Sequence, residues 1–422
     1  MMALRLRPLE LALFLFPIGL LLLGLASLEL ARQRAVGSGA LAQWLAFAVL
    51  LLATHLWIAG RRPFADQRPL AVAGGLAAVG LTMVSRLAAD LALRQLVWVA
   101  LGLGVCAAAA TFPSGVGWLK RYRYTWAALG LGLVMLTLVF GVDPNGSGAR
   151  LWLGAGGLHF QPSEVLKVLA VVFFASYLDD YRELLAYAGP RVGPVRLPPL
   201  PYLAPLLLML GLSQALLVWQ RDLGAALLFF GVFLTLLYVA SGRWEYLAAG
   251  LGLFLAGATV AYRLFDHIQL RVAIWLDPWA QAETGGYQLI QALYALAGGG
   301  LTGVGLGRGY PEYIPAVHTD FVIAAIGEEL GLAGALGVVA LYALFVHLGV
   351  RIALAARSGF GQLLAAGLTA VVGIQSFIIL AGTLRLIPLT GITLPLISYG
   401  GSSVLANFLV VGLLLAVAGE EP

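Results

Sequence analysis

Twelve apolar stretches follow one another along the chain, separated by short polar breaks. Each is close to the roughly 20 residues that a helix needs to cross a lipid bilayer. The pattern therefore predicts an all-α polytopic membrane protein with about 12 transmembrane helices. The stretches lie at 10–30, 39–60, 69–86, 91–112, 122–141, 162–178, 203–219, 222–240, 245–265, 321–350, 359–382 and 395–418.

The composition supports this class and excludes several others. Hydrophobic residues make up 61% of the 422 residues and charged residues 11%, whereas soluble domains carry about 25% charged residues. A membrane β-barrel would instead show alternating segments of about ten residues. The single cysteine, Cys106, lies inside an apolar stretch, so a disulfide framework and a cysteine-based metal site are both excluded.

The basic residues indicate membrane topology, and the net charge of +5 does not indicate nucleic-acid binding, because these residues lie in short loops between helices. Lys and Arg concentrate in cytoplasmic loops. An even number of spans places both termini on one side of the membrane. If that side is the cytoplasm, the two tightest basic clusters also face the cytoplasm. Asp320 then faces outward. The two clusters are Arg61, Arg62 and Arg68, and Lys120, Arg121 and Arg123.

The longest stretch between spans, at about 266–320, carries the most conspicuous polar group of the chain. It contains an amphipathic segment at 271–279, a short interfacial helix expected at 287–296 and a glycine-rich run at 298–309. It ends on His318-Thr319-Asp320 at the mouth of an apolar helix. A carboxylate there is costly unless it is solvated, paired or used. Asp320 could also serve only as a helix N-cap.

Metal binding by His318 is a weaker interpretation. No second His or carboxylate stands at ligand spacing beside His318, and the chain has only five His.

A second polar group lies at the start of the stretch 162–178. Pro162 and Ser163 are helix-start signals, and Glu164 and Lys167 follow at a spacing that places both on one helix face. Two interpretations stay open. The residues form a structural ion pair, or Lys167 offers its charge to an anionic ligand while Glu164 positions it.

Two further polar sites have the same ambiguity. Gln220-Arg221-Asp222 is the only break between two spans, so it must be a tight turn, either solvated or part of a site. Arg150 lies two residues before Trp152 in a loop predicted outside the membrane. Such a pair is typical of an interfacial anchor, but an arginine there could also bind a phosphate or a sugar.

The segment that joins the last two spans cannot be a regular helix. Pro388, Gly391 and Pro395 break it, and hydroxyls and glycines fill 398–403. Non-helical backbone at membrane depth is tolerated only where protein or a wet cavity satisfies it. The segment is therefore predicted to line a cavity on the outer side, close to the loop at 298–320.

These motifs together resemble the SEDS family (shape, elongation, division, sporulation), which contains the RodA/FtsW-type cell-wall polymerases. They occur in the family's order and cover roughly 69–418. The motifs are Gln161-Pro-Ser-Glu164 with Lys167, Gln220-Arg-Asp-Leu-Gly224, Gly286-Tyr-Gln288, the run Gly298–Gly309, His318-Thr-Asp-Phe321, Gly327-Glu-Glu-Leu-Gly331, and Pro388-Leu-Thr-Gly391 through Pro395 to Ser403.

The resemblance implies a domain organisation. Residues 1–68 would form two extra N-terminal transmembrane helices, as in some RodA-like members. Residues 69–422 would form the core of ten spans, with a large extracytoplasmic loop at about 266–320. The chain departs from the family at Arg221, where a proline is common, and at Arg385, where many members carry glycine.

The resemblance also implies an activity. The protein would be an inverting peptidoglycan glycosyltransferase that polymerises lipid II at the outer face of the bacterial cytoplasmic (inner) membrane. Its partner would be a class B penicillin-binding protein supplying the transpeptidase. The family's catalytic carboxylate corresponds to Asp320, which we interpret as the general base. A lipid II flippase and a membrane scaffold for that partner stay as alternative hypotheses.

The candidate substrate-binding residues are the polar side chains of these motifs. They are Lys167, Glu164, His318, Thr319, Glu312, Gln220, Asp222, Arg150, Arg221, Ser398 and Ser402. No cofactor is required by the sequence, although a divalent cation could bridge the pyrophosphate of the substrate.

Overall fold

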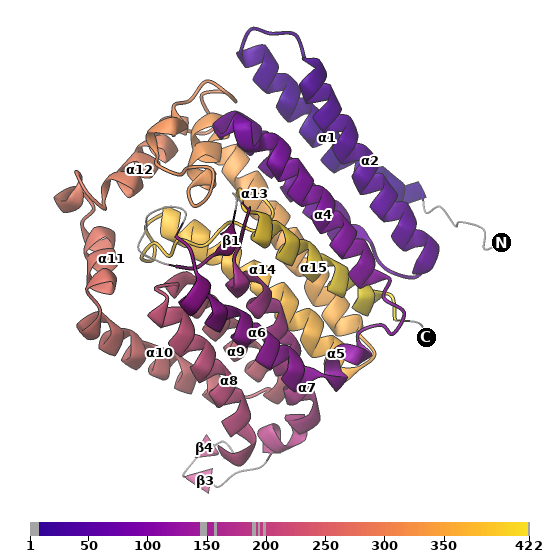
Figure 1. Ribbon diagram of the computed structural model, residues 1–422, viewed down its shortest axis with the longest axis vertical. Coiled ribbons are helices and arrows are strands. Elements are labelled where there is room, and N and C mark those ends of the chain that lie inside the picture. Colours follow the sequence, from indigo (N-terminus) through magenta and orange to yellow (C-terminus); the bar gives the residue numbers. More distant parts are fainter. Residues whose placement is uncertain are drawn as a thin grey trace. The chain divides into compact units, whose positions relative to one another are not determined.

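The computed structural model describes residues 8–143, 150–155, 158–187, 191–192, 195–196 and 200–420. These residues form mainly long helices (Figure 1). Each of the twelve predicted stretches coincides with one of them. The long helices are α1 (Pro8–Ala31), α2 (Ser38–Arg61), α3 (Arg68–Leu87), α4 (Ala92–Ala110), α6 (Arg123–Phe140), α7 (Pro162–Tyr187), α8 (Leu200–Trp219), α9 (Leu223–Ser241), α10 (Trp244–Leu264), α13 (Val322–Ala355), α14 (Gly359–Thr383) and α15 (Gly401–Ala418).

Eleven helices in the described part of the chain are long and apolar enough to cross a membrane. The remaining predicted span, α7, has 26 residues, and at about 1.5 Å per residue it is long enough. It carries six charged residues towards its two ends, Glu164, Lys167, Asp179, Asp180, Arg182 and Glu183. The fold is therefore that of the predicted all-α polytopic membrane protein.

Shorter elements lie between the long helices. They are α5 (Gly117–Arg121), α11 (Asp266–Leu276), α12 (Tyr287–Gly299), the 3-10 turns η1 (Ala89–Leu91), η2 (Trp279–Gln281) and η3 (Pro311–Tyr313), and the strands β1 (Leu153–Ala155), β2 (Leu158–Phe160), β3 (Arg191–Val192) and β4 (Val195–Arg196). β1 pairs with β2 and β3 with β4, both antiparallel. The two expected interfacial segments are the helices α11 and α12, whereas neither hairpin was predicted.

The chain divides into two compact units. The first comprises Met1–Gly115, Arg271–Leu348 and Gln375–Pro422, and the second Val116–Leu270 and Gly349–Ile374. In the first unit α4 packs along α15 and also contacts α2, while α1 packs on α3 (Figure 1). In the second unit α7 packs between α6 and α9, and α10 contacts α9.

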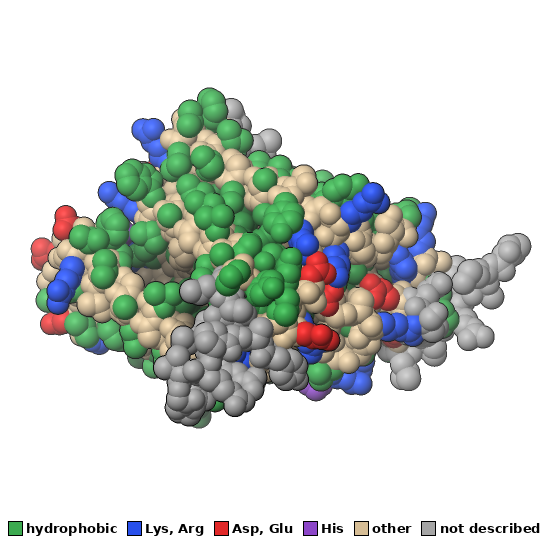
Figure 2. All heavy atoms as spheres, turned by 90° about the horizontal axis from the view of Figure 1, so that it is seen from below, with side chains coloured by type: hydrophobic (Ala, Val, Ile, Leu, Met, Phe, Trp, Pro, Cys, Tyr) green, Lys and Arg blue, Asp and Glu red, His purple; other side chains and the backbone are tan. Residues whose placement is uncertain are grey.

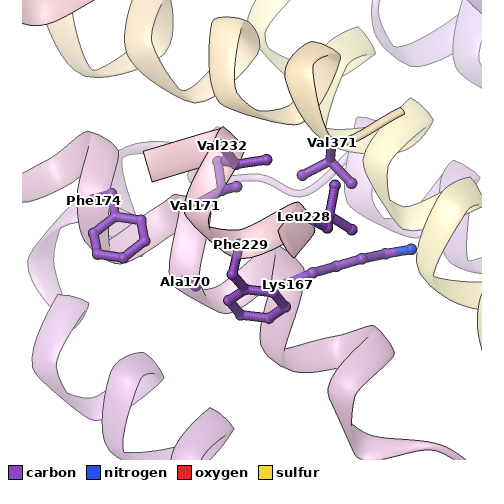
Figure 3. Close-up of a pocket in the computed structure, with 8 residues that line it drawn as sticks. All are labelled: Lys167, Ala170, Val171, Phe174, Leu228, Phe229, Val232 and Val371. Carbon is purple, nitrogen blue, oxygen red and sulfur yellow. The ribbon is translucent and has the colours of Figure 1, made fainter. Parts of the chain in front are cut away.

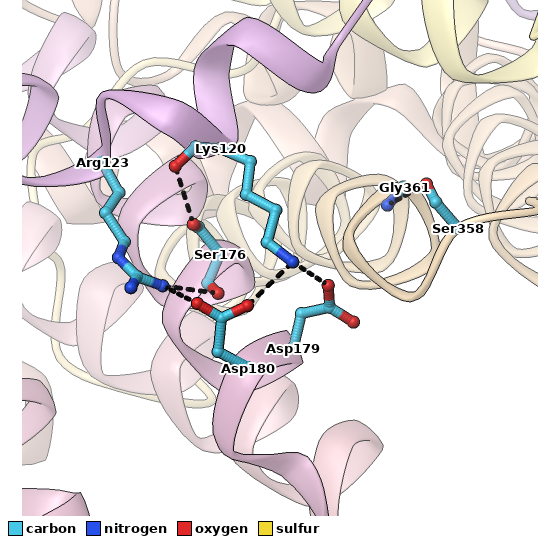
Figure 4. A network of polar contacts seen from close by, with 7 residues as sticks. All are labelled: Lys120, Arg123, Ser176, Asp179, Asp180, Ser358 and Gly361. Carbon is cyan, nitrogen blue, oxygen red and sulfur yellow. Dashed lines mark hydrogen bonds and ion pairs between the residues drawn. The ribbon is translucent and has the colours of Figure 1, made fainter.

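The charged end of α7 is neutralised within the second unit. Lys120 Nζ lies 2.6 Å from an Asp179 carboxylate oxygen and 2.8 Å from one of Asp180, and Arg123 also pairs with Asp180 (Figure 4). Arg123 additionally donates to the Ser176 carbonyl oxygen at 3.2 Å. These bonds join the α5–α6 region to α7. They also pair the half-buried carboxylates Asp179 and Asp180, which would be costly without a partner.

The apolar surface agrees with a membrane environment. Figure 2 shows hydrophobic side chains over much of one face. α10 is the extreme case, because only Tyr246 and Gly250 in it are buried, while Leu253 on it is 60% exposed. A soluble protein rarely exposes apolar surface on this scale. We infer that the exposed side chains of α10 face lipid.

Two predicted spans differ in detail from the structure. The last begins at Gly401, not at residue 395, because the irregular segment extends to Gly400. α13 is kinked at Gly331, where φ is +66°. A Cβ atom at Gly331 would lie 2.3 Å from the Gly303 nitrogen, so only glycine fits this close approach. The glycine run supplies amide and carbonyl partners across the kink, since the Val304 and Gly305 amides donate to the carbonyls of Glu328 and Glu329 at 3.0 Å.

Candidate active site

Asp320 lies just before α13 and does not cap it. The Phe321 carbonyl accepts the Ala324 amide at 2.8 Å, which makes Phe321 the residue that begins the helical bonding pattern. The interpretation of Asp320 as an N-cap is therefore wrong. Asp320 as a whole residue is partly exposed.

The irregular segment between α14 and α15 holds the residues around Asp320 in place. Ser398 donates its hydroxyl to the Thr319 carbonyl oxygen, and the Tyr399 amide donates to the His318 carbonyl oxygen at 2.9 Å. The Ser398 hydroxyl oxygen also accepts the Leu394 amide at 3.0 Å. The predicted closeness of this segment to the loop at 298–320 is confirmed.

The environment of Asp320 moves the pKa of its carboxyl group towards neutral pH. Removal of water around the carboxyl group raises its pKa to about 6, against the opposite effects of the Thr319 hydroxyl and the Arg271 charge. Loss of water also lowers the pKa of His318. At pH 7 Asp320 is therefore mainly ionised and His318 mainly neutral.

A buried ion pair fixes the glycine run in the first unit. Arg86 Nε lies 2.8 Å from Glu329 Oε1, and the Glu329 side chain is fully buried. Arg86 also donates to the Gly309 carbonyl oxygen at 2.9 Å, and the Gly307 amide donates to Glu329 Oε2 at 2.9 Å. Glu312, a predicted substrate ligand, lies 3.5 Å from Arg86. Arg86 and Glu329 are not among the site residues predicted from the sequence, because their pairing depends on how distant segments pack.

Glu164 and Lys167 form the ion pair that their spacing predicts, in the second unit. Lys167 Nζ lies 2.5 Å from Glu164 Oε2, with the two side chains 3% and 11% exposed. Figure 3 shows Lys167 at the edge of an apolar pocket, with its amine pointing away from Phe229. The pocket is lined by Lys167, Ala170, Val171, Phe174, Leu228, Phe229, Val232 and Val371. A cation in this setting is an expensive group that its carboxylate partner stabilises.

The turn at Gln220-Arg221-Asp222 is tight, as predicted, but only Arg221 is exposed. Asp222 caps α9 by accepting the Ala225 amide at 3.1 Å and also accepts the Ser163 hydroxyl at 3.2 Å. The Gln220 amide group donates to the Thr137 hydroxyl at 2.7 Å. The solvated-turn interpretation is therefore wrong for Gln220 and Asp222. Asp222 braces the start of α7 through Ser163, next to Glu164, whereas Gln220 joins the turn to α6.

The other predicted site residues have fewer contacts that define a role. Arg150 is exposed, and its neighbour Trp152 pairs with Val142, whose amide donates to the Trp152 carbonyl at 2.8 Å. The rest of that predicted loop lies partly outside the described residues. Ser402 is buried in the first turn of α15. The structure thus brings the candidates together as two groups, one around Asp320 and one around Lys167.

These features define a multi-pass helical membrane protein with a cluster of polar side chains in each unit. The chain belongs to the family of cell cycle proteins that includes FtsW, RodA and SpoVE, whose family model matches residues 74–421. The family membership that the motifs suggested is confirmed. α1 and α2 precede the matched region.

Named relatives are similar over most of their length. The peptidoglycan glycosyltransferase RodA of Mycobacterium tuberculosis is 41% identical over 387 residues, covering 89% of this chain and 82% of the relative. The probable peptidoglycan glycosyltransferase FtsW of Geobacter sulfurreducens is 35% identical over 333 residues, covering 77% of this chain and 84% of the relative. The higher identity to RodA agrees with a RodA-like member.

Solved structures show the same fold. One, from work on the coordination of polymerization and crosslinking by a peptidoglycan synthase complex, aligns with a TM-score of 0.70 at 30% identity, covering 84% of this chain and 97% of that chain. The Thermus thermophilus rod shape determining protein RodA aligns with a TM-score of 0.60 at 27% identity, covering 84% of this chain and 96% of that chain.

Proposed function

We propose that this protein is a peptidoglycan glycosyltransferase that polymerises lipid II into glycan strands for cell elongation or division. Relatives that carry this activity in their names support the reaction class. The observation that carries the proposal is Asp320, a carboxylate with a pKa of about 6, held at the mouth of α13 by the segment around Ser398.

The proposed location is the bacterial cytoplasmic membrane, with Asp320 at its outer face and both termini in the cytoplasm. The basic clusters of the α2–α3 and α4–α6 connections support this orientation, because Lys and Arg favour the cytoplasmic side. Lipid II at the outer face of the membrane would then lie on the same side as the Asp320 carboxylate.

In the proposed mechanism, Asp320 accepts the proton from the 4-hydroxyl of the acceptor sugar. The resulting oxygen attacks the anomeric carbon of the growing chain, and undecaprenyl pyrophosphate leaves with inversion. The leaving group gains negative charge, which a nearby cation stabilises. Lys167 is our first candidate for that cation, with Arg150 and Arg221 next. His318, Thr319, Ser398 and Ser402 are proposed to shape the site around the acceptor.

The remaining substrate ligands and partners are also proposals. Glu164, Gln220 and Asp222 are proposed to position Lys167, and Glu312 to assist from its place beside Arg86. A class B penicillin-binding protein is the proposed partner, supported by the similarity to a peptidoglycan synthase complex. We propose that no protein-held cofactor is needed, and that any divalent cation is bound through the pyrophosphate.

The direct test is to incubate the purified protein and its transpeptidase partner with lipid II in detergent and to separate the products on a gel. We expect glycan strands from the wild-type chain. A chain that makes no polymer but moves lipid II between the leaflets of liposomes would be a flippase. A chain that does neither, yet binds the transpeptidase, would be a scaffold.

The rate of polymerisation is expected to rise with pH through about 6 and to level off above that value. A general base acts in its deprotonated form, and the pKa of Asp320 is raised to about 6, so acidification below this value protonates the base. Initial rates measured from about pH 5 to about pH 8 check this. A profile that stays flat across this range contradicts the role of Asp320.

A further inference from the structure

α11 has no buried residue, yet its carboxyl end is held firmly by the segment that follows α14. Arg385 Nε donates to the Trp275 carbonyl oxygen at 2.7 Å, and the same guanidinium donates to the Leu276 carbonyl oxygen. Trp275 Nε1 donates in return to the Arg385 carbonyl oxygen at 3.1 Å. We call these reciprocal bonds between Arg385 and residues 275–276 the α11 latch.

The latch has a clear physical basis. The last carbonyl groups of a helix have no partners within it, and a cation near that end is favourable because the helix dipole is negative there. Arg385 provides both the donors and the charge, and its guanidinium also lies 5.5 Å from the centre of the Trp279 ring. An otherwise exposed helix is thereby fixed to the irregular segment.

Arg271 lies on α11 one helical turn before Trp275, so the latch also holds Arg271 in place. Residues four apart share one helix face, and Arg271 Nη1 donates to the Leu389 and Thr390 carbonyl oxygens at 3.2 and 3.0 Å. The next residue, Gly391, lies against the site, since a Cβ atom there would be 3.8 Å from Asp320 Oδ2. The positive charge of Arg271 also acts on Asp320 and lowers its pKa.

We propose that Arg271 is a positioning residue for the glycosyl transfer, held in place by the α11 latch. It fixes residues 389–391 beside Asp320 and maintains a positive charge near the carboxylate. The inference rests on the proposed function of Asp320 as the base. Through Arg271, α11 would then determine both the position of Asp320 and its affinity for a proton.

Thr319 and His318 are the polar residues next to Asp320 in the chain. Thr319 lowers the pKa of Asp320 through its hydroxyl. His318 stands two residues away, with its ring 5.9 Å from the Tyr399 ring, and is influenced by the Asp90 charge. Of these groups, Arg271 alone brings a positive charge to Asp320 at neutral pH.

Two substitutions at one position separate charge from geometry. In the full-length protein, Arg271→Gln removes both the positive charge and the guanidinium group that donates to the two carbonyl oxygens. Arg271→Lys keeps the charge but loses the guanidinium group. We expect both to slow lipid II polymerisation about 10- to 100-fold, because small displacements of a catalytic group have effects of this size. Of the two, only Arg271→Gln should also move the acid limb of the pH–rate profile to higher pH.

Two rate results would overturn the proposal. One is a wild-type rate in Arg271→Gln, and the other is a slowed Arg271→Gln enzyme whose acid limb has not moved, which would make Arg271 a purely structural residue. Arg385→Met tests the latch. Because it releases α11 and with it Arg271, we expect a slower rate than wild type and an acid limb moved in the same direction as in Arg271→Gln, and a wild-type rate would show that the latch does not hold Arg271.

Hydrogen exchange gives a readout that does not depend on activity. Arg271→Gln and Arg385→Met should both increase amide exchange in the peptides spanning 386–400, relative to wild type. Unchanged exchange there in both variants would overturn the positioning role even if the enzyme is active. If both variants increase exchange but the wild-type chain makes no polymer, the positioning role stands and the proposed function is wrong.

Discussion

Asp320→Asn will reduce the rate of lipid II polymerisation by about 10²- to 10⁴-fold, which is the usual contribution of a general base. Asparagine has nearly the same shape as aspartate but cannot accept the proton of the attacking hydroxyl. The Ser398 hydroxyl and the Tyr399 amide bond to backbone oxygens of Thr319 and His318, so the substitution leaves this scaffold in place. The measurement is the initial rate of glycan formation by the purified variant.

The same substitution should not unfold the protein. A carboxyl group whose folded pKa is raised stabilises the fold below its unfolded pKa of 3.8, and this contribution is lost as the pH rises through about 6. At pH 7 the wild-type chain has already lost it. Asp320→Asn should therefore melt at the same temperature as the wild type or higher.

Glu283→Gln is the matched control for Asp320→Asn, because Glu283 is an exposed carboxylate in the same loop. It should polymerise lipid II at the wild-type rate. If Asp320→Asn also turns over like the wild type, the assignment of the base is lost. If both variants are equally slow, the effect belongs to the charge of the loop and not to Asp320.

Lys167→Met will abolish activity and also destabilise the protein. It leaves the Glu164 carboxylate without its partner in a buried position, and breaking a buried ion pair in this way costs about 3–5 kcal/mol. The melting temperature should fall clearly below that of the wild type. This result alone does not separate a structural ion pair from a cation that serves the leaving pyrophosphate.

The double variant Lys167→Met/Glu164→Leu separates the two roles. Replacing both members of a buried pair by apolar side chains removes the unpaired charge and is often neutral for stability. We expect the double variant to recover its melting temperature and to stay inactive, because the cation for the pyrophosphate is missing. Recovery of both stability and activity would show that the pair is only structural.

The helices of this protein could be predicted because each is encoded locally. A run of about 20 apolar residues identifies a span wherever it occurs, and Pro162 identifies the start of α7 without knowledge of any neighbour. The pairing of Glu164 with Lys167 follows in the same way from a spacing of three residues. The tight turn at 220–222 was predictable because two spans leave no room for a longer one.

The tertiary partners of the polar groups could not be predicted. In the sequence Arg385 is only a departure from the family pattern, whereas in the structure it caps the carboxyl end of α11. Arg271 was assigned only to an amphipathic segment. In each case the sequence shows that a charge is costly, but the identity of the group that satisfies it depends on how distant segments pack.

The Arg86–Glu329 pair has a consequence for biosynthesis. Its two members are 243 positions apart in the chain, and a ribosome that adds about 5–20 residues per second needs roughly 10–50 s to cover that distance. Arg86 is therefore synthesised long before its partner exists. A chain whose synthesis stops between the two helices carries this arginine without its carboxylate partner, and an unpaired charge inside a membrane is costly.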